Sequence, residues 1–226
     1  MLSEGVATKA KLAPSESAAS TARLERVDIA ISLRIIVFLS FLTASFFVNV
    51  DGAVFAPALL SIQNDLHINK KEIAILNGVT FIFCGIFTIF TAPVMLQFEA
   101  RTVLTFSALC NAIGTFLFIG SKNFYVMVFG RALSGIAQAW ICTYAPVWIN
   151  EFAPRAYQTT WMGLYQAVSI IGAVIGTVLG SIAADNRELG IQGWFTWRTT
   201  LFFPASAFLK LALTWYCMRN YVLDTQ

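Results

Sequence analysis

The stretch Asn123–Gly163, NFYVMVFGRALSGIAQAWICTYAPVWINEFAPRAYQTTWMG, decides the fold that we expect for this chain. It begins with an apolar run long enough to cross a bilayer, carries Arg131 within that run, and turns at a polar corner before a second apolar run. An ionisable group inside a spanning helix costs at least ~2.5 kcal/mol when it faces lipid. Arg131 is therefore expected to face a partner, a water-filled cavity or both. The small residues around it predict close packing against neighbouring helices.

The composition is that of an integral membrane protein. The 226 residues are 58% hydrophobic and only 12% charged, whereas soluble domains carry roughly 25% charged residues. The net charge of +3 gives no indication of a nucleic-acid partner. Four cysteines without CxxC spacing and a single histidine predict neither a metal site nor a cofactor. Without paired carboxylates in one span or a Ser/His/Asp set, we do not expect an enzyme.

Six apolar runs predict an all-α membrane protein, because each approaches the ~20 residues that a helix needs to cross the hydrocarbon. Their expected bounds are about 35–60, 73–96, 102–121, 124–149, 158–183 and 199–218. They would form one six-helix bundle over residues 34–220, between a disordered cytoplasmic tail (1–33) and a short C-terminal end (221–226). Basic residues before the first span, with Arg101, Arg155 and Arg219, favour a cytoplasmic location for both termini.

Two charges are expected at similar depths in the membrane. At 1.5 Å per residue, Asp51 lies about 24 Å along the first span and Arg131 lies about 10 Å from the start of the fourth, which runs the opposite way. An ion pair between them, or a shared watery cavity, would let the membrane hold both charges. The alternative is that Asp51 caps the outer end of its helix.

Further polar residues predict a solute pathway inside the bundle. Gln138 lies two helical turns beyond Arg131 on a similar face, and Gln166 lies in the fifth span. For Gln138 an interhelical hydrogen bond is an equal alternative to a role in binding a ligand. Small residues predict where helices pack closely, as in a GxxxG pattern. These are Gly135 in the fourth span and Gly172, Gly176 and Gly180 in the fifth.

A weak similarity between two segments of the chain indicates an internal repeat. The first span ends in AVFAPALLSIQND (53–65), and the fourth ends in AWICTYAPVWINE (139–151). Each places Ala-Pro after an intramembrane charge and before an Ile and an acidic residue. Two three-helix units of related pattern are typical of half a transporter.

Four segments together resemble the first half of a major facilitator superfamily transporter, from about residue 46 to 204. GRALSGIAQA (130–139) resembles the Arg-x-x-x-Gly motif of the fourth helix, and NEFAPRAYQ (150–158) resembles the Glu-x-x-Pro cytoplasmic corner. The glycine ridge formed by Gly172, Gly176 and Gly180 resembles the glycine-rich fifth helix, and Trp197-Arg198 with Phe202 and Pro204 resembles the start of the sixth. The resemblance implies a 3+3 inverted repeat and transport by alternating access.

Within the superfamily, the chain looks similar to spinster-type transporters. Asp51 followed by IQNDLHI (62–68), and RALSGIAQA followed by APVW, carry this likeness. Spinster relatives export lipids such as lysophospholipids and sphingosine phosphate from lysosomes or across the plasma membrane. The resemblance therefore implies a small amphipathic solute, for example a lysolipid or sphingolipid, and a plasma or endolysosomal membrane. A sugar or drug facilitator of the same superfamily is the alternative substrate class.

The chain departs from the family pattern in three places. The loop LQFEART (96–102) has Gln97 at the family's Asp position and retains only Arg101 of the family's basic residues. In the family this loop forms the cytoplasmic gate, so we expect Gln97 and Arg101 to form it here together with the corner residues Glu151 and Arg155. Gln138 occupies a position that is acidic in spinster relatives, which leaves Asp51 as the candidate proton site. Six spans instead of twelve predict truncation, with either self-association or a missing C-terminal half. They also support the alternative of a transport-inactive scaffold or regulatory protein.

Overall fold

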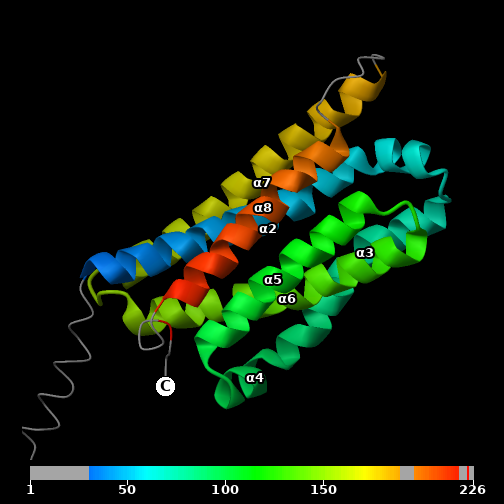
Figure 1. Ribbon diagram of the computed structural model, residues 1–226. Helices are drawn as coiled ribbons and strands as arrows, with labels where there is room; N and C mark the ends of the chain where they lie inside the picture. The colour runs from blue at the N-terminus through cyan, green and yellow to red at the C-terminus, as the bar shows by residue number, and fades with distance from the viewer. Residues whose placement is uncertain (1–30, 189–195, 219–222, 224–226) are drawn as a thin grey trace, which may run out of the picture.

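The computed structural model describes residues 31–188, 196–218 and 223, which form an elongated bundle of helices (Figure 1). Most of the predicted tail (1–30) and most of the C-terminal end lie outside the described residues, as does Arg219. The helices are α2 (Ile31–Leu66), α3 (Lys70–Ile89), α4 (Thr91–Gln97), α5 (Ala100–Gly120), α6 (Phe124–Phe152), α7 (Gln158–Glu188) and α8 (Trp197–Cys217). In the described part, six helices, all but α4, are long and apolar enough to cross a membrane. The fold is thus all-α with six spans, as predicted.

The second predicted span, 73–96, is wrong as a single helix. It is broken at Phe90 into α3 and the short α4. Pro93 accounts for the break, because proline has no N–H to donate to the carbonyl of Ile89 and its ring crowds that carbonyl. The Phe90 N–H instead bonds the Phe87 carbonyl at 3.1 Å. The spanning part of this segment therefore ends at Ile89.

Helix α7 packs along α2 more extensively than any other pair of helices in the described bundle. Its three ridge glycines make this approach close. A Cβ added at Gly172 would lie 2.6 Å from the Phe46 carbonyl oxygen, and one added at Gly180 would lie 2.6 Å from the Val54 oxygen. Any larger residue would force the two backbones apart, so the glycines set the spacing of α2 and α7.

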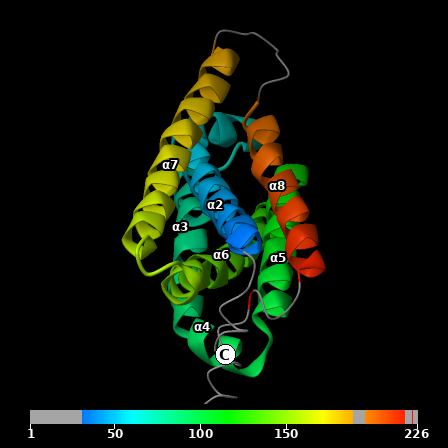
Figure 2. The ribbon, with the colours of Figure 1, turned by 90° about the vertical axis from the view of Figure 1, so that its left-hand side faces the viewer.

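The remaining helices close the bundle around α2 and α6. Figure 2 shows α2 lying between α7 and α8. Helix α6 contacts α5 where Gly114 faces Gly130, and it contacts α3 where Gly135 meets the backbone of Thr80. Bulky aromatic side chains fill the space between these close contacts. Those that are fully buried include Phe41, Phe118, Trp148, Phe208 and Trp215.

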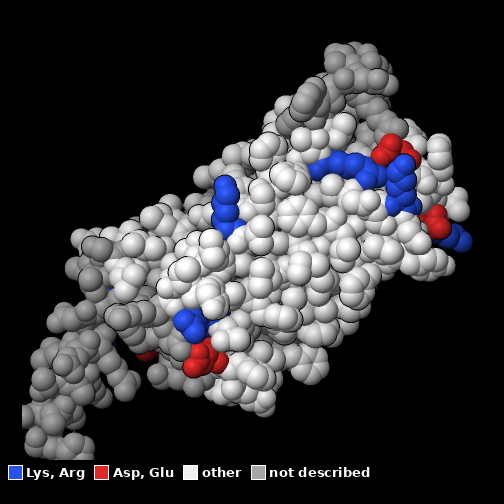
Figure 3. All heavy atoms as spheres, viewed as in Figure 1, with Lys and Arg blue, Asp and Glu red and all other residues white. Residues whose placement is uncertain are grey.

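The outside of the bundle is largely apolar between two charged ends. Figure 3 shows that charged side chains gather toward the two ends of the face in view and that its middle is mostly uncharged. Large apolar side chains such as Phe81, Ile89, Phe129 and Leu213 are exposed. Helix α2 begins and α8 ends at the same end of the bundle (Figure 1). This surface suits a bilayer, with six crossings that return the chain to its starting side.

Candidate solute site in the helix bundle

The centre of the bundle holds an ion pair between α2 and α6. Arg131 Nη1 lies 3.1 Å from Asp51 Oδ2, and only 3% of Arg131 and 1% of Asp51 are exposed. The structure thus brings together the two charges that the sequence placed at similar depths. Capping by Asp51 is wrong as an alternative, because α2 continues past this residue to Leu66.

Two aromatic rings complete the surroundings of the Arg131 guanidinium. Its Cζ lies 4.7 Å from the ring centre of Phe55 on α2 and 4.1 Å from that of Phe118 on α5. The face of an aromatic ring attracts a cation, more strongly when both are shielded from water. The rings and the carboxylate together offset the loss of hydration of the buried guanidinium.

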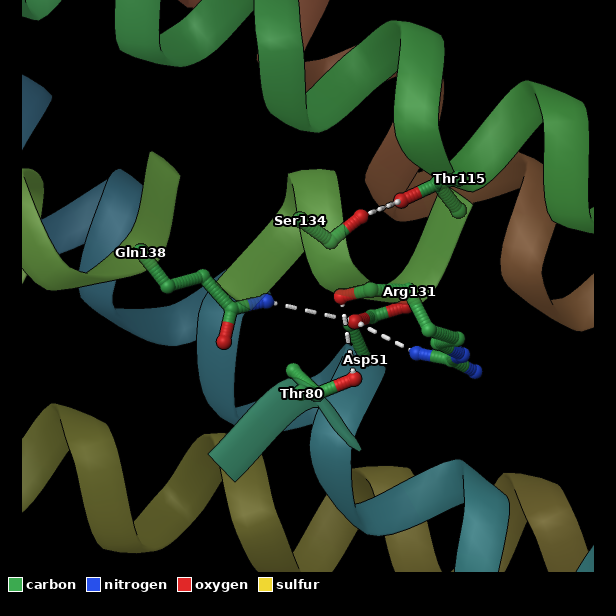
Figure 4. Close-up of polar contacts among 6 residues, drawn as sticks. All are labelled: Asp51, Thr80, Thr115, Arg131, Ser134 and Gln138. Carbon is green, nitrogen blue, oxygen red and sulfur yellow. Dashed lines mark hydrogen bonds and ion pairs between the residues drawn. The ribbon is translucent and has the colours of Figure 1, made fainter. Parts of the chain in front are cut away.

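Gln138 forms a hydrogen bond with the carboxylate of Asp51, on the side opposite to Arg131. Its Nε2 donates to Asp51 Oδ2 at 3.4 Å, so that Asp51 lies between Arg131 and Gln138 (Figure 4). The hydroxyl of Thr80 on α3 donates to the backbone carbonyl of Arg131 at 3.3 Å. Residues of α2, α3 and α6, far apart in the chain, therefore converge on one polar cluster.

The cluster is not saturated with hydrogen bonds. Asp51 Oδ1 and Arg131 Nε and Nη2 are buried and have no hydrogen-bond partner among the described residues. Buried polar atoms are nearly always paired with protein or water. Three such atoms in one ion pair therefore leave capacity for a solute or for water.

A cavity of about 300 Å³ lies beside the pair, between α2, α3, α6 and α7. Its volume is at the lower end of the range for small-molecule sites. The polar lining is Asn49, Asn77, Thr80, Arg131 and Gln138, and apolar side chains including Phe55, Leu76 and Phe81 line the rest. Sequence reasoning missed Asn77 and Thr80, although their spacing of three residues in an otherwise apolar span marks one face of a helix.

Gln166 is not part of this cluster. It is exposed on α7 and does not line the cavity. The polar contact between α7 and α2 in this region comes instead from Ser169, whose hydroxyl lies 2.5 Å from that of Ser45. The four predicted packing glycines all lie where a neighbouring backbone approaches closely.

The residues predicted for the gating loop and corner lie at the end of the bundle where α2 begins. Arg101 Nη1 donates to the carbonyl of Met218 at 3.4 Å and so links the start of α5 to the end of α8. Gln97, Glu151 and Arg155 are exposed. In the described structure no ion pair joins Arg101 to Glu151.

Known protein sequences identify the family. The sequence pattern of the Major Facilitator Superfamily matches residues 39–224. The glucose transporter GlcP of Staphylococcus epidermidis is 25% identical over 144 residues, which are 64% of this chain and 31% of the transporter. Monosaccharide-sensing protein 3 of Arabidopsis thaliana is 28% identical over 106 residues, 46% of this chain and 14% of that protein. The chain therefore spans less than a third of the length of these relatives.

Solved structures show the same fold. A bacterial homologue of the human lysosomal transporter Spinster, inward-facing and unoccupied, matches with a TM-score of 0.71 at 16% identity, over 84% of this chain and 44% of that one. A proton:xylose symporter matches with a TM-score of 0.69 at 15% identity, over 84% and 45%. Six helices of this chain thus correspond to about half of the superfamily fold. The chain belongs to the Major Facilitator Superfamily and is an integral, multi-pass membrane protein.

Proposed function

We propose that this protein carries a small, neutral, hydroxyl-rich solute such as a sugar across the membrane by alternating access. One observation carries the proposal. A buried ion pair with unused hydrogen-bonding atoms lies against a polar-lined cavity among membrane-spanning helices. An ionisable residue within a membrane span marks a functional site, such as a solute or ion pathway, by default.

The chemistry of the lining favours a neutral solute. The charges of Asp51 and Arg131 cancel, so the cavity offers no net charge to an anion or a cation. The amides of Asn49, Asn77 and Gln138 each donate and accept hydrogen bonds, which matches hydroxyl groups that do the same. The glucose transporter among the relatives supports this choice.

A second candidate is an amphipathic lipid such as a lysolipid or sphingolipid. The apolar part of the lining, with Phe55, Leu76 and Phe81, would accommodate an alkyl chain. The likeness to the fold of the Spinster homologue supports this candidate. It predicts the same pathway residues but a different preference for substrates.

In the proposed cycle the ion pair changes partners as the cavity opens to each side. Arg131 Nε and Nη2 donate to the solute, and Asp51 retains the hydrogen bond from Gln138. Asp51 is the candidate proton site, because the neighbouring Gln138 cannot take up a proton. The cavity of this fold lies between two six-helix units, so a second copy or a C-terminal half would close its open side.

The orientation is inferred from the basic residues of both ends. Lys9, Lys11, Arg23 and Arg26 precede α2, and Arg34, Arg101 and Arg155 belong to the end where α2 begins, whereas the other end has Lys70, Lys71, Lys122 and Arg198. Cytoplasmic loops carry an excess of Lys and Arg. We therefore place this end, with Gln97 and Glu151, in the cytoplasm of a cell whose plasma or endolysosomal membrane holds the protein. Arg101 and Arg155 would act in the gate.

The test is solute counterflow into proteoliposomes, with radiolabelled monosaccharides and lysophospholipids as probes. Asn77→Ala should raise the KM for the preferred solute about 2–10-fold, as expected for one lost hydrogen bond. Arg131→Ala should abolish flux while the protein still inserts. The matched control is Thr88→Ala on the exposed side of α3, whose hydroxyl bonds only Cys84 of its own helix.

The outcomes separate the alternatives. Undiminished flux in Arg131→Ala would reject the proposed pathway. A preference for lysophospholipids would favour the lipid candidate. Absence of flux with every probe from inserted, folded protein would favour a transport-inactive scaffold or regulator.

A further inference from the structure

A second cavity, of about 490 Å³, lies between α2 and α8 on the outside of the bundle. It shares no lining residue with the solute cavity. Its apolar lining includes Ile36 and Leu39 of α2 and Phe203 of α8, all three exposed. Both helices are candidate membrane spans, so this groove lies at the depth of the acyl chains of a bilayer.

One basic side chain lies in the groove. Lys210 is exposed and lines the cavity. It precedes the end of α8 at Cys217 by about 10 Å at 1.5 Å per residue, so its backbone lies within the spanning region rather than beyond it. No carboxylate of the described residues forms an ion pair with it. A cation at this depth is stabilised by a counter-charge nearby or by reaching toward the membrane surface.

The hydroxyl groups of the groove do not supply donors. Thr43 donates to the carbonyl of Leu39, and Thr214 donates to that of Lys210. Ser206 likewise donates to Phe203 of its own helix. Each hydroxyl proton is thus directed back to the helix backbone, which leaves the Lys210 ammonium as the donor for any ligand. The groove is therefore suited to a ligand that accepts hydrogen bonds and carries negative charge.

We propose that the groove between α2 and α8 binds one anionic phospholipid of the surrounding bilayer. Its phosphate would contact Lys210, and one acyl chain would lie along Ile36, Leu39 and Phe203. The flexible stem of lysine lets the ammonium reach toward the headgroup layer while its methylene groups stay in apolar surroundings. The lipid belongs to the leaflet that meets the end of α8. The site rests on membrane insertion alone and is independent of the solute that the central cavity takes.

Native mass spectrometry of the purified protein tests the proposal. Phosphatidylglycerol and phosphatidylcholine with identical acyl chains are titrated onto delipidated protein. We expect the first phosphatidylglycerol to bind about fivefold more tightly, which corresponds to one lysine attracting one anionic lipid. Lys210→Gln should reduce this preference to near unity. Lys122→Gln, at an exposed lysine between α5 and α6, should leave it unchanged.

A second variant separates a groove from a diffuse charge effect. Ala207→Phe fills the cavity and keeps Lys210 in place. It should weaken the binding of the first molecule of either lipid, with an unchanged melting temperature in detergent. The proposal is overturned if Lys210→Gln retains the preference for phosphatidylglycerol. It is equally overturned if Ala207→Phe binds both lipids as the unmodified protein does.

Discussion

The free energy that couples Asp51 to Arg131 can be measured with a double-mutant cycle. The variants are Asp51→Asn, Arg131→Gln and the two combined. Both residues are almost fully buried, and the charged atoms are 3.1 Å apart. Each single change leaves one charge without its partner in the interior, whereas the double change leaves two neutral amides that can bond each other.

The expected size follows from this burial. Removing one partner of a buried pair destabilises by about 3–5 kcal/mol. For a domain of this size, that corresponds to a fall in melting temperature of about 6–20 °C. We expect Arg131→Gln to cost more than Asp51→Asn, because it also removes the contacts with the rings of Phe55 and Phe118. The coupling free energy should be about 2–3 kcal/mol, near the upper end of measured values.

The assay is thermal unfolding in detergent, followed by the loss of monodisperse protein after heating. The half-exposed pair of Arg198 and Asp65, 3.6 Å apart, is the internal control. Asp65→Asn should cost less than about 1 kcal/mol, because exposed pairs are weak. The double variant of the buried pair should melt above the temperature expected if the losses of the two single variants simply added.

One result would refute the reasoning. If the losses of the two single variants simply add in the double variant, within about 0.5 kcal/mol, the charges do not stabilise each other. The ion pair would then be an incidental contact rather than the organising interaction of the site.

Three further changes test other parts of the structure. Gly176→Ala should destabilise the protein by about 1–3 kcal/mol, because a Cβ there would lie 2.7 Å from the Val50 oxygen. The control Gly163→Ala has open space around the added Cβ and should be neutral or stabilising in the same melting assay. Gln138→Glu adds a second carboxylate beside Asp51. Uptake by this variant should therefore fall at neutral pH and recover in mild acid more steeply than uptake by the unmodified protein. If the ratio of uptake at mildly acidic pH to uptake at neutral pH is the same in both proteins, this expectation is contradicted. Pro93→Ala restores the missing N–H and should join α3 to α4 into one helix. Distances between spin labels on either side of Phe90 would then report a straighter, stiffer segment. Unchanged distances would mean that another feature causes the break.

Regular geometry explains what the sequence predicted well. Helix rise is constant and successive spans alternate in direction, so the depths of Asp51 and Arg131 could be compared before their contact was known. The long apolar runs likewise predicted six spans, and the glycine ridge predicted a close approach. The ridge did not identify its partner, because any helix with small or flat residues fits; only packing of the whole bundle selects Phe46, Val50 and Val54 of α2.

Weak local signals explain what was missed. Pro93 lies within a run that stays apolar on both sides, so hydropathy alone extended the second span across the break. Asn77 and Thr80 are uncharged, and one neutral polar residue costs too little in a span to mark a site. Gln166 was expected in the pathway from its residue type, but the side of a helix that faces a cavity depends on tertiary packing.

The ion pair also has a consequence for how the chain enters the membrane. Asp51 precedes Arg131 by 80 residues, so at about 5–20 residues per second the ribosome adds Asp51 some 4–16 s before Arg131 is made. During that interval α2 holds an acidic residue with no counter-ion. Insertion measurements assign such a residue about 2.5–3.5 kcal/mol, and each Leu, Ile, Phe or Val offsets roughly 0.3–0.6. The mean hydropathy of 2.0 over Leu33–Leu59 is therefore what allows the first half of the site to enter the bilayer before the second half exists.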